Sequence, residues 1–536
     1  MTTNNFTVSN WEISHTYSSY LSFDKIDLNE LAVRLIVNDL AELIIESNEI
    51  VYWKFNDELQ VAQLILVVDE NRSSGVFHLE PLLGSTLEMT ENVGVFFNDA
   101  CNLVFSDKKL FNTANVKKNI RVYFQKFLVK YSYGEFLILP YFKIFEDGVT
   151  LVKYRIKSKN KEIEIYDFIE NFVNIGLNKF LDIKVSPSIS KLSSVAYMYS
   201  IKQSIFSRFQ CLKDANIHIN EVNNRTFDYI YENEKLKLVE LPRTEGNQDS
   251  LSSLTLTYLN IINFIYIAPD NDLKFLLFGV NEKIHQSNYW SGRPYIYLIN
   301  FEEKEQTSSQ NNNKFYKEFI GIIQRAYNPY TNIQDLPEDM RAFEDSSDFI
   351  SSSGYLCAFS NLLNEDGVKN SIYNKEIISE YLEYGYIIHR VLKAKIQHSS
   401  DLSETFSLRS DVNNLDDLYE LSYSGEVRSF LERGWQEFGL SKIKKQIDEK
   451  INIDHDYKNY KYQIYNNNFN RLLTIVFGVL TIPTLAKELI TPIWQYSEIM
   501  IPKDDNLITI FSLIIAFFVI IILIYSLRIL LKYNNK

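Results

Sequence analysis

Hydrophobic residues recur at two kinds of spacing in the first two thirds of the chain. In residues 134–158, two runs of aromatic and β-branched residues flank a polar turn, which predicts a β-hairpin that turns at Gly148. A second pair of strands is predicted at residues 273–282 and 293–303. Residues 28–47 instead place their apolar side chains on one face at helical spacing, which predicts a helix. Strands and helices together indicate a mixed α/β (α+β) domain.

The pattern changes after residue 365, where long stretches at helical spacing follow without strand signals. Proline, which breaks helices, is absent from residues 338–482. An apolar stripe runs along the later part of this region through Ile443, Ile447, Ile451, Tyr457, Tyr460 and Ile464. Two interpretations stay open: a packed helical domain, or a stalk that transmits motion to a membrane.

Two long apolar runs close the chain, Leu472–Trp494 and Leu507–Leu527. The second has 21 residues without a charge or a proline, and at about 1.5 Å per residue it is long enough to cross roughly 30 Å of hydrocarbon. The first run is long enough too, but it contains two prolines and the charged pair Lys487 and Glu488. Together they predict a C-terminal two-helix transmembrane hairpin.

Basic residues near the two runs predict the orientation of this hairpin. Lys458, Lys461 and Arg471 precede the first run, and Arg528, Lys532 and Lys536 follow the second. The positive-inside rule then places both termini in the cytoplasm of a multi-pass protein, and we expect the bacterial inner (plasma) membrane. The predicted organisation is a cytoplasmic mixed α/β sensing domain at 1–365, a helical stalk at 366–470, transmembrane helices at 471–494 and 507–531, an outer loop at 495–506 and a basic tail at 532–536.

Composition narrows the classes of function. The net charge of −13 argues against direct nucleic-acid binding, because phosphate contacts need clustered cations. The histidines have no metal-ligand spacing, and no phosphate-binding glycine loop or nucleophile elbow is present, so we expect neither an enzyme nor a bound cofactor. Trp290 and Arg293 form a weak ligand-binding candidate, since an aromatic face beside a guanidinium suits a phosphate or nucleotide. A turn with a surface arginine is the alternative.

A polar stripe on the first apolar run provides the candidate chemistry. Steps of three and four residues from Arg471 lead through Thr474, Gly478, Thr481, Leu485, Glu488, Pro492 and Gln495. Around a symmetry axis, identical helices with such a 3.5-residue repeat would all turn this stripe inward and line a water-filled path. An intramembrane carboxylate costs on the order of 3 kcal/mol unless it is hydrated or paired, which favours an axial Glu488. Tight helix packing by small and hydroxyl residues is the alternative. Arg471 would lie at the inner mouth of such a pore. It either tunes ion passage there or only anchors the cytoplasmic end of the helix.

The C-terminal architecture resembles the CorA-like divalent cation transporter superfamily. A long helix that enters the first span, a proline midway through that span, a short acidic outer loop and a basic tail carry the likeness, with the local match in the stretch TIVFGVLTIPTLAKEL. The resemblance covers about residues 420–536. It implies a homopentamer in the bilayer, with a funnel-shaped cytoplasmic domain and a pore lined by the first span. A divalent cation would then be the transported or regulatory ion.

One departure from the family changes the functional expectation. The family's Gly-Met-Asn signature should fall at the outer mouth, where this chain has Pro492, Ile493 and Trp494. Hydrated-magnesium selectivity therefore does not carry over. Superfamily members without the signature include proteins encoded beside prokaryotic defence systems such as type III CRISPR loci, and this likeness implies an antiviral membrane effector that responds to a small nucleotide messenger. A housekeeping Mg, Zn or Ni transporter and a membrane-tethered sensor or scaffold without conduction are the alternatives.

Overall fold

The computed structural model of the chain divides into two compact units. Unit 1 comprises residues 1–399 and 406–447, and unit 2 comprises residues 400–405 and 448–536. The residues that the structure describes are 6–21, 26–67, 76–83, 87–112, 117–131, 133–158, 161–200, 204–231, 234–241, 250–267, 274–276, 288–289, 292–326, 336–398, 422, 424–496 and 505–533.

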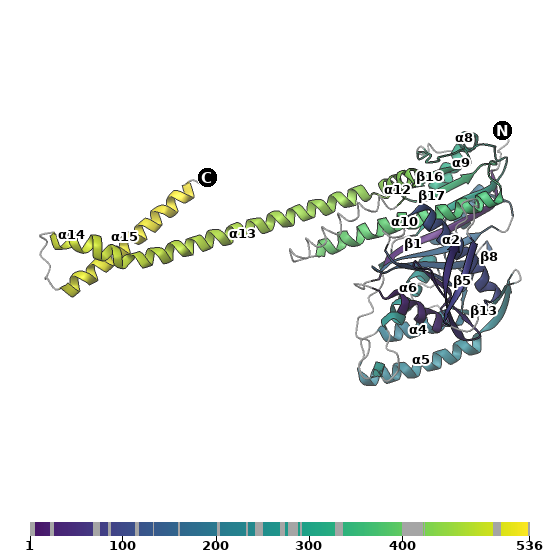
Figure 1. Cartoon of the computed structure of the whole chain (residues 1–536), viewed down its shortest axis with the longest axis horizontal. Coiled ribbons are helices and arrows are strands. Elements are labelled where there is room, and N and C mark those ends of the chain that lie inside the picture. Colours follow the sequence, from purple (N-terminus) through teal and green to yellow (C-terminus); the bar gives the residue numbers. More distant parts are fainter. Residues whose placement is uncertain are drawn as a thin grey trace. The chain divides into compact units, whose positions relative to one another are not determined.

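Unit 1 is a mixed α/β structure with a large sheet and many helices (Figure 1). Its strands are β1 (Thr7–Tyr20), β2 (Ala41–Glu46), β3 (Ile50–Phe55), β4 (Glu58–Val67), β5 (Val76–Leu83), β6 (Asn119–Phe124), β7 (Phe127–Tyr131), β8 (Gly134–Phe145), β9 (Val149–Lys157), β10 (Ile163–Glu164), β11 (Asp182–Val185), β12 (Phe227–Tyr231), β13 (Glu234–Glu240), β14 (Asn288–Tyr289), β15 (Arg293–Phe301), β16 (Ser346–Ser351) and β17 (Gly354–Phe359). Its helices are α1 (Leu28–Val37), α2 (Glu91–Leu110), α3 (Ile165–Phe168), η1 (Ile169–Val173), η2 (Ile175–Leu177), α4 (Pro187–Ser200), α5 (Ile205–Arg225), α6 (Leu251–Ile267), α8 (Ser308–Lys314), α9 (Tyr316–Ile323), α10 (Glu365–His398) and α12 (Gly425–Glu437).

The main sheet runs in the order β5–β4–β3–β2–β6–β8–β9–β1–β15–β17–β16, and only the β15–β17 pairing is parallel. Strand β8 is long enough to belong to two sheets. Its second half pairs with β6, and its first half pairs with β7, which continues into β11, β13 and β12. The predicted hairpin at 134–158 is confirmed as β8 and β9. Its turn needs a glycine, because Gly148 has a φ of +90° and a Cβ there would lie 2.3 Å from the carbonyl oxygen of Leu21.

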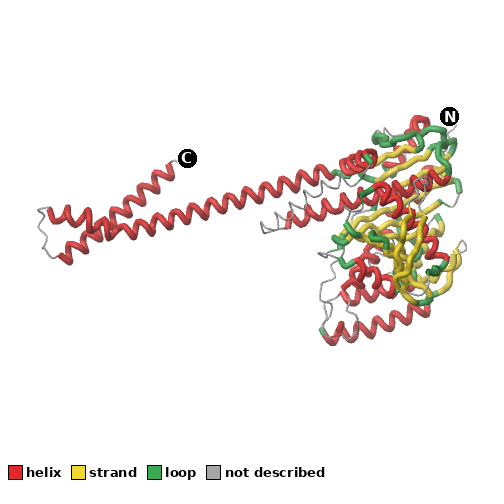
Figure 2. The backbone as a smooth tube through the Cα atoms, in the orientation of Figure 1, coloured by secondary structure: helices red, strands yellow, loops and turns green. Residues whose placement is uncertain are grey.

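Helices cover both faces of this sheet (Figure 2). One face packs against α1, α4 and α6 in an apolar core that includes Val122, Phe142 and Val152. The other face packs against α2, α10 and α12 in a second core. Helices α10 and α12 approach closely, since a Cβ on Gly385 would lie 2.6 Å from Nε1 of Trp435. The three cysteines, Cys101, Cys211 and Cys357, are buried and free.

Two sequence predictions fail in unit 1. The helix predicted for residues 28–47 ends at Val37, and residues 41–46 form strand β2. The break falls where Asp39 adopts a positive φ of 53°, which no helix interior allows. The strand predicted at 273–282 is also wrong where it can be tested, because residues 274–276 are helical and the rest lie outside the described residues. Its partner, β15, is confirmed.

Helix α10 belongs to unit 1, although the sequence analysis placed it in a separate stalk from residue 366. It packs against β1, β9 and β15 of the sheet and against α2 and α12. In unit 1, the start of the next helix is also packed, since Ile443 and Ile447 are buried. A compact boundary therefore falls after residue 447.

Unit 2 holds most of the long helix α13 (Leu440–Leu485), the π-helical segment η4 (Ala486–Ile490), α14 (Thr491–Tyr496) and the apolar α15 (Asp505–Tyr533). Helix α15 packs against η4 and α14. Among the described residues, one helical stretch, Leu440–Ile493, is long and apolar enough to cross a membrane. The later part of the predicted stripe is exposed within this unit, at Tyr457, Tyr460 and Ile464.

Candidate functional site

The face of the sheet that meets α10 carries charges where a core would carry apolar side chains. Neighbouring residues of a strand point to opposite faces, so Val122, Phe142 and Val152 enter the apolar core on one side. The residues beside them in the sequence, Arg121, Lys143 and Lys153, point to the other side and are buried under α10. Each of these strands is therefore apolar on one face and cationic on the other, and both faces are covered.

Glu380 of α10 is the centre of the resulting network. Its fully buried carboxylate accepts hydrogen bonds from Arg121 Nη1 at 2.8 Å, from Lys143 Nζ at 2.9 Å and from the hydroxyl of Tyr141. Burial alone would raise the pKa of Glu380, but Arg121 and the two neighbouring lysines outweigh it and hold the pKa well below its usual range. Glu380 is therefore ionised at neutral pH.

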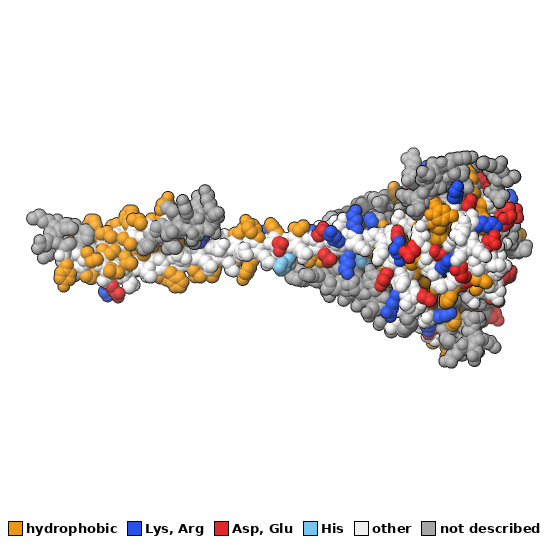
Figure 3. Space-filling view, turned by 90° about the horizontal axis from the view of Figure 1, so that it is seen from above, with side chains coloured by type: hydrophobic (Ala, Val, Ile, Leu, Met, Phe, Trp, Pro, Cys, Tyr) orange, Lys and Arg blue, Asp and Glu red, His pale blue; other side chains and the backbone are white. Residues whose placement is uncertain are grey.

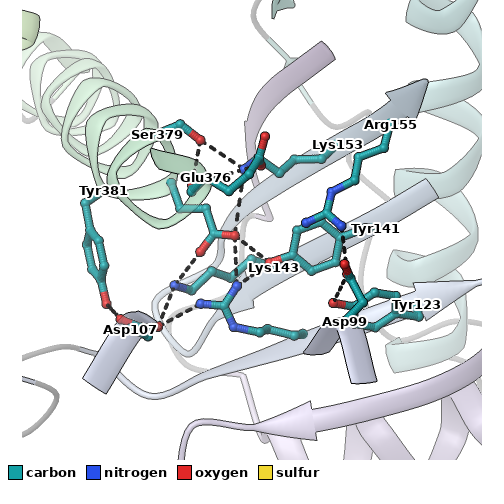
Figure 4. Close-up of polar contacts among 12 residues, drawn as sticks. Asp99, Asp107, Tyr123, Tyr141, Lys143, Lys153, Arg155, Glu376, Ser379 and Tyr381 are labelled. Carbon is teal, nitrogen blue, oxygen red and sulfur yellow. Dashed lines mark hydrogen bonds and ion pairs between the residues drawn. The ribbon is translucent and has the colours of Figure 1, made fainter. Parts of the chain in front are cut away.

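Helix α2 contributes two more carboxylates from the side. Asp107 accepts hydrogen bonds from Arg121 Nη2 at 2.7 Å and from the hydroxyl of Tyr381 at 2.7 Å. Asp99, two turns earlier, accepts from Arg155 Nη1 at 2.7 Å and from the hydroxyl of Tyr123 at 2.9 Å (Figure 4). Both carboxylates thus connect α2 to the cationic face of the sheet.

Other pairs extend the network along α10. Lys153 Nζ donates to the Glu376 carboxylate and, at 3.0 Å, to Ser379 Oγ (Figure 4). Burial would lower the pKa of Arg155, but the carboxylates of Asp99 on α2 and Glu376 on α10 raise it. Carboxylates of both helices therefore stabilise the charged form of Arg155. Two further ion pairs lie at the ends of this network. Lys375 pairs with Asp348 at 2.6 Å, and Arg293 pairs with Glu383 at 2.8 Å. The charged layer, as we call this set, comprises Asp99, Asp107, Arg121, Lys143, Lys153, Arg155, Arg293, Asp348, Lys375, Glu376, Glu380 and Glu383.

Cations and carboxylates occur in equal numbers in the charged layer, so its formal charge is zero. Moving an ion from water into the protein interior costs several kcal/mol of free energy. Ion pairing offsets this desolvation cost only when the geometry of the pair is good. Removing one partner is much more destabilising, at about 3–5 kcal/mol, because the other charge stays buried and unpaired. The layer therefore makes the placement of α10 and α2 sensitive to any change in charge between them. The paired charges therefore fix the positions of these two helices relative to the sheet.

Of the two residues of the weak ligand candidate predicted from sequence, the structure describes Arg293. Trp290 lies outside the described residues. Arg293 is a member of the charged layer, and its guanidinium lies 4.2 Å from the ring centroid of Tyr386 and 3.9 Å from that of Phe438. The alternative of a surface turn arginine is wrong, because the side chain is only 12% exposed. This guanidinium is engaged in an ion pair and in contacts with two aromatic rings.

The residues of the predicted pore stripe lie in unit 2, and Thr474, Thr481 and Glu488 are exposed there. Both threonine hydroxyls donate to a carbonyl oxygen of their own helix, at 2.8 Å in each case. Arg471 is also exposed, Gly478 and Leu485 are partly buried, and the side chains of Trp494 and Gln495 lie outside the described residues.

The π-helical segment η4 changes the geometry of that stripe. A single π turn holds one residue more than an α turn, so the side chains beyond it are rotated by about 100° relative to an unbroken helix. The predicted stripe assumes an unbroken α-helix. On the helix that the chain forms, Pro492 and Ile493 are therefore rotated by about this angle relative to that prediction.

The cavities that described residues of unit 1 line include three that differ in charge. The first has about 30 Å³ and borders the charged layer at Arg121, Asp107 and Tyr381. The second has about 390 Å³ and is lined by three carboxylates and one lysine, namely Asp27, Glu46, Glu146 and Lys118. The third has about 200 Å³ and is lined by three lysines and one carboxylate, namely Lys126, Lys235, Lys237 and Glu42. Only the third combines excess positive charge with room for more than a few waters.

Comparison with known proteins leaves these features to be interpreted from geometry alone. No protein-family model, no curated protein and no solved structure matches the chain. Among the described residues, no group of three or more His, Cys, Asp or Glu side chains could hold a metal ion. The features of the molecule that bear on function are thus the exposed apolar helix, the charged layer and these three cavities.

Proposed function

We propose that the protein is an oligomeric, CorA-like membrane ion channel or transporter that its α/β unit gates from the cytoplasm. The observation that carries the proposal is the apolar window within Leu440–Ile493, of which only 6% is buried inside the protein. Figure 3 shows hydrophobic side chains covering the surface of this part of the chain. Exposed large apolar side chains include Leu472, Ile475, Val476, Phe477, Val479 and Leu480. Burying each in lipid or against another copy is worth on the order of 1.5–3 kcal/mol.

The contacts of α15 support a membrane hairpin as part of this proposal. Small side chains form the interface with η4 and α14, since Ala486, Ser512 and Ala516 are all buried. Thr491 Oγ1 and Ser512 Oγ lie 3.2 Å apart, within hydrogen-bond distance. Close packing through small residues, with hydroxyls bonding between helices, is typical of helix pairs in lipid, where no hydrophobic effect drives association. The opposite faces of α15 stay apolar and exposed, for example at Ile510, Phe518 and Ile522.

Glu488 is the residue that favours conduction over simple anchoring. It lies in η4, and single π turns within α-helices occur frequently at functional sites. The carboxylate is exposed, and a lipid-facing position would cost on the order of 3 kcal/mol. If several copies of the helix surround a water-filled axis, Glu488 faces that axis and is hydrated there. Thr474 and Thr481 then lie on the same line. A scaffold that only anchors the α/β unit would have no use for this carboxylate.

Ion flux tests the proposal directly. The full-length protein is reconstituted in liposomes that contain a divalent-sensitive dye, and Mg²⁺, Zn²⁺ and Ni²⁺ are added with and without nucleotide messengers. Flux without a ligand indicates a housekeeping transporter, and flux only with a messenger indicates a defence effector. A Glu488→Ala variant that inserts and assembles normally should show altered flux. Silence of the wild-type protein in every condition would refute conduction and leave the scaffold.

A further inference from the structure

The cavity lined by Lys126, Lys235 and Lys237, which we call the lysine cavity, lies beside the first turn of α2. Strand β2, α2, the β6–β7 turn and β13 each contribute to its wall. Besides the lysines it presents the side-chain amides of Asn92 and Gln125 and the apolar surfaces of Phe96 and Leu236. Gln125 Nε2 donates to the carbonyl oxygen of Lys237 at 3.2 Å and so ties β13 to the β6–β7 turn.

We propose that the lysine cavity binds a soluble small molecule that carries a diphosphate or triphosphate group. Three lysines face one carboxylate there, in a chain whose overall net charge is −13, so the charge of the cavity is opposite to that of the protein. A volume of about 200 Å³ holds more than one phosphate-sized group. Lysine ammonium groups and amide N–H groups are the donors that phosphate oxygens accept from.

The one carboxylate of the cavity is compatible with an anionic ligand. Burial raises the pKa of Glu42, and the nearby Asp39 raises it further. Protonation of Glu42 removes its negative charge and gives the carboxyl an O–H that can donate to a phosphate oxygen. A bound phosphate would raise the pKa of Glu42 again, for the same electrostatic reason.

The other two cavities are poorer sites for such a group. At the smallest cavity, the guanidinium of Arg121 is already held by Asp107 and Glu380, and Lys108 pairs with Glu49. The largest cavity has three carboxylates against one lysine and would repel a polyphosphate. The lysine cavity is therefore the one of the three whose charge and size both suit it.

A chain of contacts leads from the lysine cavity to the charged layer. The ring of Phe96, on the wall of the cavity, stacks on Tyr123 with their centroids 5.7 Å apart. The Tyr123 hydroxyl donates to Asp99, which holds Arg155 beside Glu376 of α10. A ligand that draws Asn92 and Phe96 toward the lysines would move α2 together with Asp99. This coupling is the regulation that the proposed function requires, and the inference of coupling therefore rests on the proposed function. Ligand binding in the lysine cavity does not rest on it.

The first experiment measures binding to the full-length protein in detergent micelles, by titration calorimetry with inorganic pyrophosphate as the probe. We expect one site in the wild type and binding weaker by about tenfold for each lysine lost, hence about a hundredfold in Lys235→Gln/Lys237→Gln. Lys130 and Lys213 are exposed and lie outside the cavity, so Lys130→Gln/Lys213→Gln is the matched control and should bind like the wild type. Equal affinity in both double variants, or no binding by the wild type, would overturn the site.

A competition arm separates a soluble ligand from a lipid headgroup. Mixed micelles that contain phosphatidylglycerol should leave pyrophosphate binding unchanged at the same ionic strength, because a single phosphodiester does not satisfy three lysines. Displacement of pyrophosphate by that lipid at lower concentrations than by free phosphate would overturn the assignment to a soluble ligand.

Coupling is tested separately by hydrogen exchange. Pyrophosphate should change amide protection in both α2 and α10 of the wild type. In Tyr123→Phe, which lacks the hydroxyl that reaches Asp99 but lies outside the cavity wall, pyrophosphate affinity should persist while the response of α10 falls. An unchanged α10 response in this variant would overturn the contact chain and leave the binding site standing. Binding without any flux in liposomes would refute the channel, and not the site.

Discussion

Replacing Glu380 with Gln tests whether the charged layer holds unit 1 together. The carboxylate accepts from Arg121, Lys143 and Tyr141, and none of its surface is exposed. The amide keeps the shape but leaves three cations, Arg121, Lys143 and Lys153, facing a neutral group, so we expect a loss of about 3–5 kcal/mol in the free energy of unfolding at pH 7. Chemical denaturation monitored by fluorescence of the buried tryptophans, such as Trp435, measures this loss.

A surface pair provides the control for that prediction. Glu305 accepts from Lys314 at 2.8 Å and is 39% exposed, so Glu305→Gln should change the free energy of unfolding by less than about 1 kcal/mol. The Glu380→Gln effect should also depend on pH. Because the folded pKa of Glu380 lies below the usual 4.5, its contribution is fully present above that pH and is lost as the pH falls below it. A loss under about 1 kcal/mol at pH 7, or one that does not shrink in acid, would refute the reasoning.

Three further predictions follow from other parts of the chain. Burial lowers the pKa of His15 from 6.5 to about 3, so the wild type should lose about 1.4 kcal/mol per pH unit below pH 6.5, and His15→Gln should flatten this slope in denaturation at several pH values. Gly385→Ala should cost about 1–3 kcal/mol in the same assay, because the new Cβ would overlap Trp435, and an unchanged midpoint would contradict that close contact. Glu488→Gln should change ion selectivity in liposomes while chemical crosslinking shows the same oligomer, and identical selectivity would remove Glu488 from the pore.

The sequence predicted those features that depend on apolar patterns. The β8–β9 hairpin followed from two apolar runs around Gly148, and the apolar window within the helical stretch Leu440–Ile493 was expected from the length and hydropathy of the run Leu472–Trp494. Both signals are local, because turn geometry and transfer from water act on neighbouring residues. The switch from helix to strand after Val37 was missed because residues 41–46 are a short apolar run that suits either structure.

The charged layer was missed for a different physical reason. Alternating charges in a strand, such as Lys153 and Arg155 in β9, normally indicate a face in water, and the same holds for Glu376, Glu380 and Glu383 on α10. Each element alone is therefore consistent with a solvated surface. Only the tertiary pairing shows that two such surfaces neutralise each other. The available signal was their complementarity, with cations on β6, β8, β9 and β15 and carboxylates on α2 and α10, the pair of Asp348 on β16 and Lys375 on α10 being reversed.

This complementarity also determines how α10 can respond to a change elsewhere. Apolar contacts are non-directional, so an apolar interface tolerates sliding, whereas ion pairs and charged hydrogen bonds need particular partners. A shift of α10 by one helical turn, about 5.4 Å, would separate Lys375, Glu380 and Glu383 from their partners together. Intermediate positions are therefore costly, and α10 should keep one register until several pairs change at once. Such an all-or-none element would suit the gate of the proposed channel, and α2 contacts it directly where Asp107 accepts a hydrogen bond from Tyr381 of α10.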